Sequence, residues 1–297
     1  GAAEPTGLCD EDRPRLPDGS LPQGRIADIA SLPSPAVRAY NRAYAADLAR
    51  AYPSIAGFRI DWPEYPCYTP DEIFQDFSQH VANWAGGHGW DFESIRRNML
   101  DFQSALRVGI SNDLLQAFDD VGSGRAALQD WLSNYPSVTD WLKLKAALSV
   151  DLISDWRTLV DELDGPGRQL SVHAFMPPFS TLTGFDFAAA ARLADSISPK
   201  FYTMHWRLMV SQWGHWLLKH NPQLDESLLT AALVNLLQLA DEEPASVTLD
   251  DFAYPAPDQP HPIGSHAQQI KIEQVCRAVV GQAKVFPLVH GYGPEDD

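Results

Sequence analysis

Apolar residues recur along the chain in two patterns, one typical of helices and the other of short strands. The longest helical pattern covers residues 139–163, where tryptophan and leucine return every three or four positions. The same spacing predicts further helices over residues 35–48, 73–84, 91–107, 112–134, 186–197, 208–220, 225–241 and 265–282. A break is expected at Gly122-Ser123-Gly124, because glycine is unfavourable inside a helix.

Short apolar runs that end at a proline or glycine predict strands between these helices. The predicted strands are residues 54–63, 169–175, 200–206 and 284–290. Long helical connections favour parallel pairing, and no Asn-Gly hairpin turn joins the runs. The fold class expected is therefore α/β, with a (β/α)8 TIM-type barrel carrying long helical insertions.

The ends of the chain and one internal segment depart from these patterns. Residues 1–30 are rich in proline, glycine and charge and are expected to form an extended N-terminal arm ahead of a barrel domain over 31–297. Residues 243–264 contain five prolines and are expected to form a long excursion. No basic segment followed by an apolar stretch is visible at the start, so no signal peptide is expected.

Composition narrows the class of partner. The chain has 22 basic and 39 acidic residues, a net charge of −17, which disfavours nucleic acid and anionic membranes. Its longest apolar run, residues 230–240, is too short to cross a bilayer, so a soluble protein is expected. The three cysteines are far apart and indicate neither a disulfide framework nor a zinc ribbon.

Each predicted strand ends at an ionisable side chain. In parallel α/β folds the carboxyl ends of the strands line one common crevice. In chain order the residues at these ends are Asp61, Trp62 and Glu64, then His173, then His205 and Trp206, then His290 and Tyr292. We therefore expect one site at this edge, with Asp61 and Glu64 as the catalytic residues and the others as substrate-binding residues.

Two carboxyl groups in an apolar pocket can take different pKa values, one acting as acid and the other as base or nucleophile. The alternative is structural: Asp61 caps a helix or pairs with a buried arginine, and Glu64 is solvated. The histidines can orient a polyhydroxylated substrate, ligate one divalent metal such as zinc or manganese with a carboxylate, or pack in the core. Trp62 and Trp206 can stack on sugar rings or fill the core.

Three segments resemble uncharacterised glycoside-hydrolase-like (β/α)8 barrels. They are Gly57-Phe-Arg-Ile-Asp-Trp-Pro-Glu-Tyr-Pro66, Ser34-Pro-Ala-Val-Arg-Ala-Tyr40 and Ser198-Pro-Lys-Phe-Tyr-Thr-Met-His-Trp206. The resemblance spans most of residues 30–293 and implies a carbohydrate-active barrel, with Asp61 at the position of the acidic residue on strand four. The four strands would then be strands four to seven of eight. We accordingly expect a segment of a longer enzyme, or a barrel that another chain completes.

The function expected is hydrolysis of a carbohydrate by strand-end carboxylates in a cleft lined by tryptophan and histidine, without a cofactor. Glu295, beyond the last predicted strand, is a second candidate for the partner of Asp61. The alternatives are a metal-dependent hydrolase or isomerase with histidine and carboxylate ligands, and a carbohydrate-binding barrel without activity.

Overall fold

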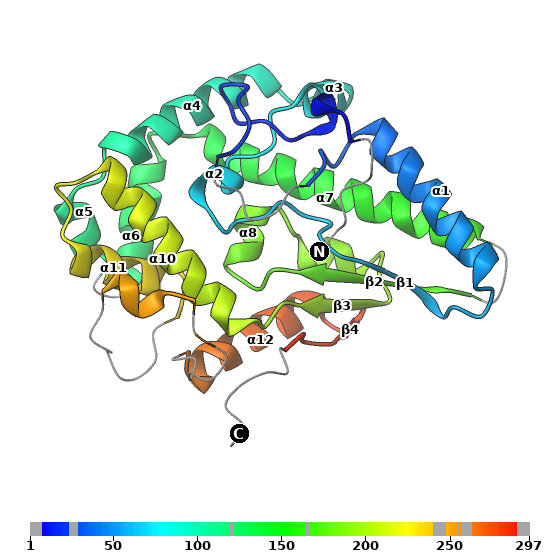
Figure 1. Ribbon diagram of the computed structural model, residues 1–297. Coiled ribbons are helices and arrows are strands. Elements are labelled where there is room, and N and C mark those ends of the chain that lie inside the picture. The colour runs from blue at the N-terminus through cyan, green and yellow to red at the C-terminus, as the bar shows by residue number, and fades with distance from the viewer. Residues whose placement is uncertain are drawn as a thin grey trace.

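The computed structural model describes residues 8–23, 29–118, 121–163, 167–239, 248–254, 256 and 263–289. Its centre is a four-stranded parallel sheet in the order β1-β2-β3-β4 (Figure 1). The strands are β1 (Gly57–Ile60), β2 (Gln169–Ala174), β3 (Ser196–Pro199) and β4 (Lys284–Val285). The chain is thus α/β with a parallel sheet, as expected, but a complete eight-stranded barrel is not shown.

The first two predicted strands are confirmed, although β1 is shorter than residues 54–63. The third prediction is wrong: β3 begins at the last two residues of the segment 186–197, which was expected to be helical, and ends at Pro199, whereas most of residues 200–206 belongs to a helix. The segment Ser196-Ile-Ser-Pro199 has one large apolar residue, Ile197, and so lacks an apolar run. In the fourth predicted strand, β4 is followed by an isolated bridge between Lys200 and Leu288.

Helices connect and flank the strands. Most begin at a side chain that caps free backbone amides, such as Ser34, Thr69, Ser78, Asp91, Ser111, Asp186 and Asp225. The described helices are α1 (Pro35–Ala51), α2 (Pro70–Ile73), α3 (Gln79–Gly87), α4 (Phe92–Val108), α5 (Asn112–Gln116), α6 (Val121–Leu132), α7 (Ser137–Glu162), α8 (Phe179–Thr183), α9 (Phe187–Ala191), α10 (Thr203–His220), α11 (Glu226–Leu236) and α12 (Ser265–Val279), with 3₁₀ turns η1 (Asp10–Asp12) and η2 (Leu249–Phe252).

The break in the 112–134 segment falls before the glycines, because α6 contains both Gly122 and Gly124. The segment predicted as one helix over 73–84 is divided into α2 and α3. Most of the Pro-rich excursion at 243–264 lies outside the described residues, which here include η2. Among the described residues, no helix combines the length and the apolar character needed to span a bilayer.

Helices α7, α9 and α12 pack against one face of the sheet. Alternate strand residues point toward them, and these meet apolar side chains of the helices. The resulting core includes Ile60, Leu170, Val172, Ile197, Ile153, Val160, Ala190, Val275 and Val279. In the described part of the chain, β1 pairs with β2 alone and β4 with β3 alone, so the sheet has two open edges. Its completion by another chain or segment stays a prediction.

The described residues of the N-terminal arm pack against the body of the protein. The buried carboxylate of Asp76 accepts hydrogen bonds from the backbone amide of Arg15 at 3.1 Å and from the hydroxyl of Ser31. Asp12 is also buried and accepts a hydrogen bond from the Ser34 hydroxyl at 2.6 Å. These bonds fix residues 8–23 beside α2 and α3.

Candidate functional site

Three charged or ionisable side chains meet at the carboxyl ends of β1, β2 and β3. Asp61 follows β1, His173 lies near the end of β2, and Lys200 directly follows β3. Asp61 Oδ1 lies 3.0 Å from His173 Nδ1 and 3.0 Å from Lys200 Nζ. The Asp61 side chain is 39% exposed, whereas that of Lys200 is 5% exposed. A buried cation therefore faces a carboxylate that solvent and ligands can reach.

The environment keeps Asp61 ionised. Partial burial alone would raise its pKa, but the hydrogen bond from His173 and the charge of Lys200 outweigh that effect and lower the pKa to about 2. At neutral pH Asp61 is thus an anion, suited to act as a nucleophile or to stabilise positive charge rather than to donate a proton.

Asp61 also determines which nitrogen of His173 carries a proton. An ionised carboxylate has no hydrogen to donate, so Nδ1 must carry the hydrogen of the 3.0 Å bond. The other ring nitrogen, Nε2, is buried and has no hydrogen-bond partner among the described residues. In the neutral ring this nitrogen is an acceptor, so Nε2 is the nitrogen through which His173 takes up or releases a proton.

Trp62 lies beside this cluster in an unusual backbone conformation. Its φ is 66°, in the left-handed region that side chains other than glycine rarely adopt, and Pro63 follows it. The turn places the half-buried indole with its ring centroid 4.0 Å from Lys200 Nζ, and Phe175 meets it edge-on at 5.6 Å. Such strain is frequent at functional sites. Trp62 thus lies where a stacking residue was expected.

Glu64 does not reach the site as a catalytic residue, which corrects the sequence-based assignment. Its side chain is completely buried and accepts hydrogen bonds from the Phe175 amide at 2.6 Å and from the Thr183 hydroxyl. Burial raises its pKa to about 7 despite the nearby Lys200. Glu64 therefore joins the segment after β1 to the segment after β2 and to α8, and it has no exposed surface for a substrate.

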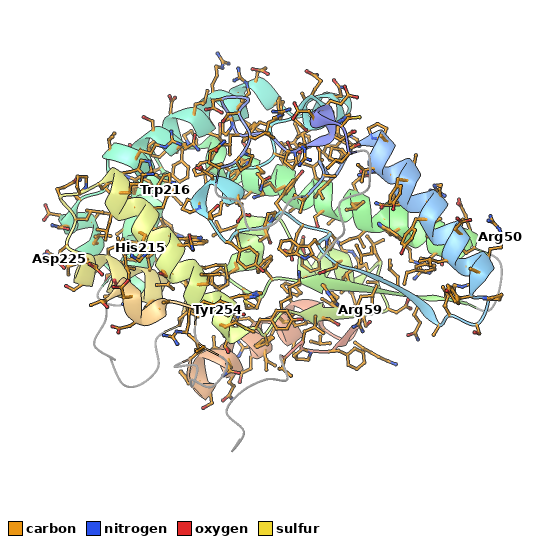
Figure 2. The ribbon with its side chains drawn as sticks, viewed as in Figure 1. Arg50, Arg59, His215, Trp216, Asp225 and Tyr254 are labelled. Carbon is orange, nitrogen blue, oxygen red and sulfur yellow. The ribbon has the colours of Figure 1, made fainter. Side chains whose placement is uncertain are left out.

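The two predicted residues after the third strand belong to α10 instead of a strand end. His205 Nδ1 lies 3.1 Å from the Tyr68 hydroxyl, and its ring also packs against Tyr202 and Tyr254 (the latter labelled in Figure 2). Trp206 is completely buried, and its Nε1 donates a hydrogen bond to the Lys200 carbonyl at 3.4 Å. A buried indole has no face for a sugar, so the stacking role assigned to Trp206 is wrong; it supports the backbone of Lys200.

His290, Tyr292 and Glu295 lie outside the described residues. Lys200 was not among the site residues predicted from the sequence, although it directly follows β3, which ends at Pro199.

The arrangement around Asp61 does not suit a metal ion. Three ligand atoms close enough to share an ion occur in the described residues at Cys9, Glu11 and Asp12, on the N-terminal segment. At the strand ends, the Lys200 ammonium lies beside the carboxylate that would bind the metal, and two like charges there repel each other.

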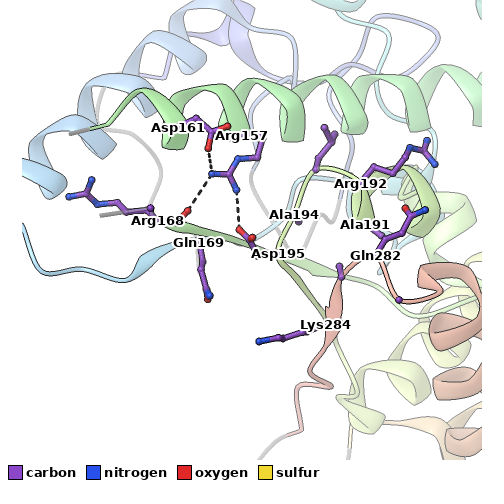
Figure 3. A pocket seen from close by; sticks show the side chains of 14 residues that line it. Arg157, Asp161, Arg168, Gln169, Ala191, Arg192, Ala194, Asp195, Gln282 and Lys284 are labelled. Atoms are coloured by element: carbon purple, nitrogen blue, oxygen red, sulfur yellow. Dashed lines mark hydrogen bonds and ion pairs between the residues drawn. The ribbon is translucent and has the colours of Figure 1, made fainter. Parts of the chain in front are cut away.

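A cavity of about 960 Å³ lies at the opposite, amino-terminal edge of the sheet (Figure 3). Arg157 lines this cavity. It pairs with Asp161 and donates hydrogen bonds to Asp195 at 3.0 Å and to the Arg168 carbonyl at 3.3 Å. Asp195 in turn accepts a hydrogen bond from the Leu170 amide at 2.7 Å. This network connects α7 to β2 and to the start of β3, a structural role typical of that end of a parallel sheet.

Comparisons of the chain with family models, with curated proteins and with solved structures found no match. The resemblance to glycoside-hydrolase-like barrels therefore stays a prediction, and the functional argument rests on the strand-end cluster.

Proposed function

We propose that the protein is a carbohydrate-active hydrolase of the glycosidase type, with its active centre at Asp61. One observation carries the proposal: an ionised, accessible Asp61 is held by Lys200 and His173 at the carboxyl edge of a parallel sheet. Hydrolysis of a glycosidic bond develops positive charge at the anomeric carbon, and a fixed carboxylate stabilises that charge or attacks the carbon.

His173 takes the proton-transfer role that the sequence suggested for Glu64. With Nδ1 bonded to Asp61, its Nε2 in the protonated ring gives a proton to the departing sugar oxygen as the glycosidic bond breaks. A water molecule then adds to the anomeric carbon and returns a proton to Nε2, so the protein ends as it began. Trp62 supplies an apolar ring face for the sugar beside these groups.

A panel of aryl glycosides and natural oligosaccharides tests the proposal with Asp61→Asn, His173→Gln and a control, Asp47→Asn, in an exposed ion pair on α1. We expect the first two variants to lower kcat/KM by about 10²–10⁴ and the control to leave it unchanged. Rates are divided by the folded fraction, because Asp61→Asn leaves the buried Lys200 without its counter-charge. Wild-type turnover that both site variants retain would contradict the proposal.

The second candidate is a carbohydrate-binding protein without activity. The burial of Glu64 favours this candidate. Two carboxylates were expected at the site, and among the described residues only Asp61 is accessible there. Oligosaccharides that bind to the wild type, lose affinity with Trp62→Ala and yield no product over long incubation would favour this candidate over the hydrolase. The metal-dependent alternative is disfavoured, because Lys200 lies at the carboxylate that would bind the ion.

A further inference from the structure

The face of the sheet opposite α7, α9 and α12 is polar. Strand register places Arg59, Ser171, Ser196 and Lys284 in one row across the four strands. Because side chains alternate between faces, this row lies on the same face as Asp61, His173 and Ser198, two residues further along their strands. Figure 3 shows Gln169 and Lys284 on the side of the sheet away from α7, consistent with this alternation.

The two ends of the row are cations that no acidic group in the described residues neutralises. Arg59 and Lys284 are both exposed, and neither takes part in an ion pair there (Figure 2 labels Arg59). The carboxylate that does belong to this face, Asp61, is already paired with Lys200 and hydrogen-bonded to His173. In a chain of net charge −17, this face therefore carries a local excess of positive charge.

Between the cations lie polar atoms that hydrogen-bond to nothing in the described part of the chain. They are the hydroxyls of Ser171 and Ser198 and the Nε2 of His173. Ser171 is half-buried, and a hydroxyl without a partner costs free energy that a bound acceptor would recover. Hydroxyl donors flanked by arginine and lysine are the groups that bind carboxylates and sulfates.

We propose that this face binds the anionic group of an acidic saccharide, a carboxylate or a sulfate, with Arg59 and Lys284 as its charged ligands and Ser171 as a neutral donor. The inference rests on the proposed function and gives it a substrate class, because the same face leads to Asp61 and His173. A neutral sugar would leave both cations unpaired, so an acidic sugar is preferred.

Titration calorimetry with three oligomers of equal length tests this: an oligogalacturonate, a sulfated galactan oligomer and a neutral galactan oligomer. The acidic ligands should bind about tenfold more tightly than the neutral one at low salt and lose that advantage as the ionic strength rises. Arg59→Gln and Lys284→Gln should each lower the affinity for the preferred acidic ligand about fivefold and leave the affinity for the neutral ligand unchanged. Which acidic ligand responds identifies the carboxylate or the sulfate.

The control variant is Arg192→Gln, which removes an exposed arginine just after α9, on the helix side of the sheet. It should leave all three affinities unchanged. Equal affinity for neutral and acidic oligomers would overturn this inference and leave the proposed function intact, whereas the absence of binding by every oligomer would count against both. A dimer in sedimentation that Arg59→Gln dissociates would also overturn it, because a second copy would then cover the face.

Discussion

Lys200 Nζ lies 3.0 Å from Asp61 Oδ1 and 4.0 Å from the centroid of the Trp62 ring. The side chain is almost fully buried, and an opposite charge nearby stabilises a buried ammonium. One lysine thus fixes both the carboxylate and the indole of the candidate site. The contacts join the ends of β1 and β3, which are not adjacent in the sheet.

Replacing Lys200 should change the titration of Asp61. In Lys200→Met the attraction of the ammonium is lost, so the pKa of Asp61 should rise from about 2 toward or above its ordinary 3.8. Carboxyl NMR of the folded variant measures the shift, and the acid limb of any pH–activity profile should move upward with it. Lys219→Met, at an exposed position near the end of α10, is the control and should leave the titration unchanged. An unaltered Asp61 pKa in Lys200→Met would show that His173 alone holds the carboxylate.

Asp61 should also contribute to stability in a narrow acidic window. Its pKa is lower in the folded state than the ordinary 3.8, so folding favours the ionised form. The stabilisation is present above about pH 3.8 and is lost as the pH falls toward 2. Denaturant unfolding between pH 2 and 5 should show a steeper loss for the wild type than for Asp61→Asn. Parallel curves would mean that the ion pair does not persist in solution.

The sequence predicted β2, in which apolar and polar side chains alternate. It missed β3, which lacks an apolar run. Leu170, Val172 and Ala174 mark β2 because they face the helices, whereas β3 has Ile197 between two serines of the polar face. Residues 200–206, expected as the third strand, are apolar because most of them belong to α10, where Trp206 packs in the core. Asp61 and His173 were found because they end regular strands. The burial of Glu64 depends on Phe175 and Thr183, more than 100 residues away in the sequence, which no local pattern reveals.

Glu64 should act on stability and not directly on catalysis. Glu64→Ala leaves the Phe175 amide without its acceptor in a buried site and should reduce the free energy of unfolding by about 2–4 kcal/mol. Glu64→Gln retains an acceptor and should cost less. Urea unfolding measures both, and the activity of Glu64→Gln per folded molecule should match the wild type.

Glu64 should also make stability depend on pH, with a sign opposite to that expected for Asp61. Burial raises the pKa of Glu64 from 4.5 to about 7, so the folded state favours the protonated form. The corresponding stability is present below about pH 4.5 and declines as the pH rises to 7. As the pH rises from 4.5 to 7, the wild type should therefore lose stability relative to Glu64→Gln. A catalytic role would instead appear as a loss of kcat in Glu64→Gln at full folding.

Lys271 on α12 offers a test of the interior away from the site. Its ammonium is buried and donates hydrogen bonds to the carbonyls of Pro177 at 3.0 Å and Leu237 at 2.8 Å, and burial lowers its pKa from 10.5 to about 7. Because the folded state favours the neutral amine, stability should rise as the pH increases from 7 toward 10.5. In Lys271→Met this contribution disappears, so urea unfolding at pH 7 to 10 should show a smaller rise than in the wild type. Lys219→Met again serves as the control, because Lys219 is exposed near the end of α10. Equal slopes for Lys271→Met and wild type would mean that the ammonium reaches solvent, and that the joint between α12 and the segment after β2 is looser than these two bonds indicate.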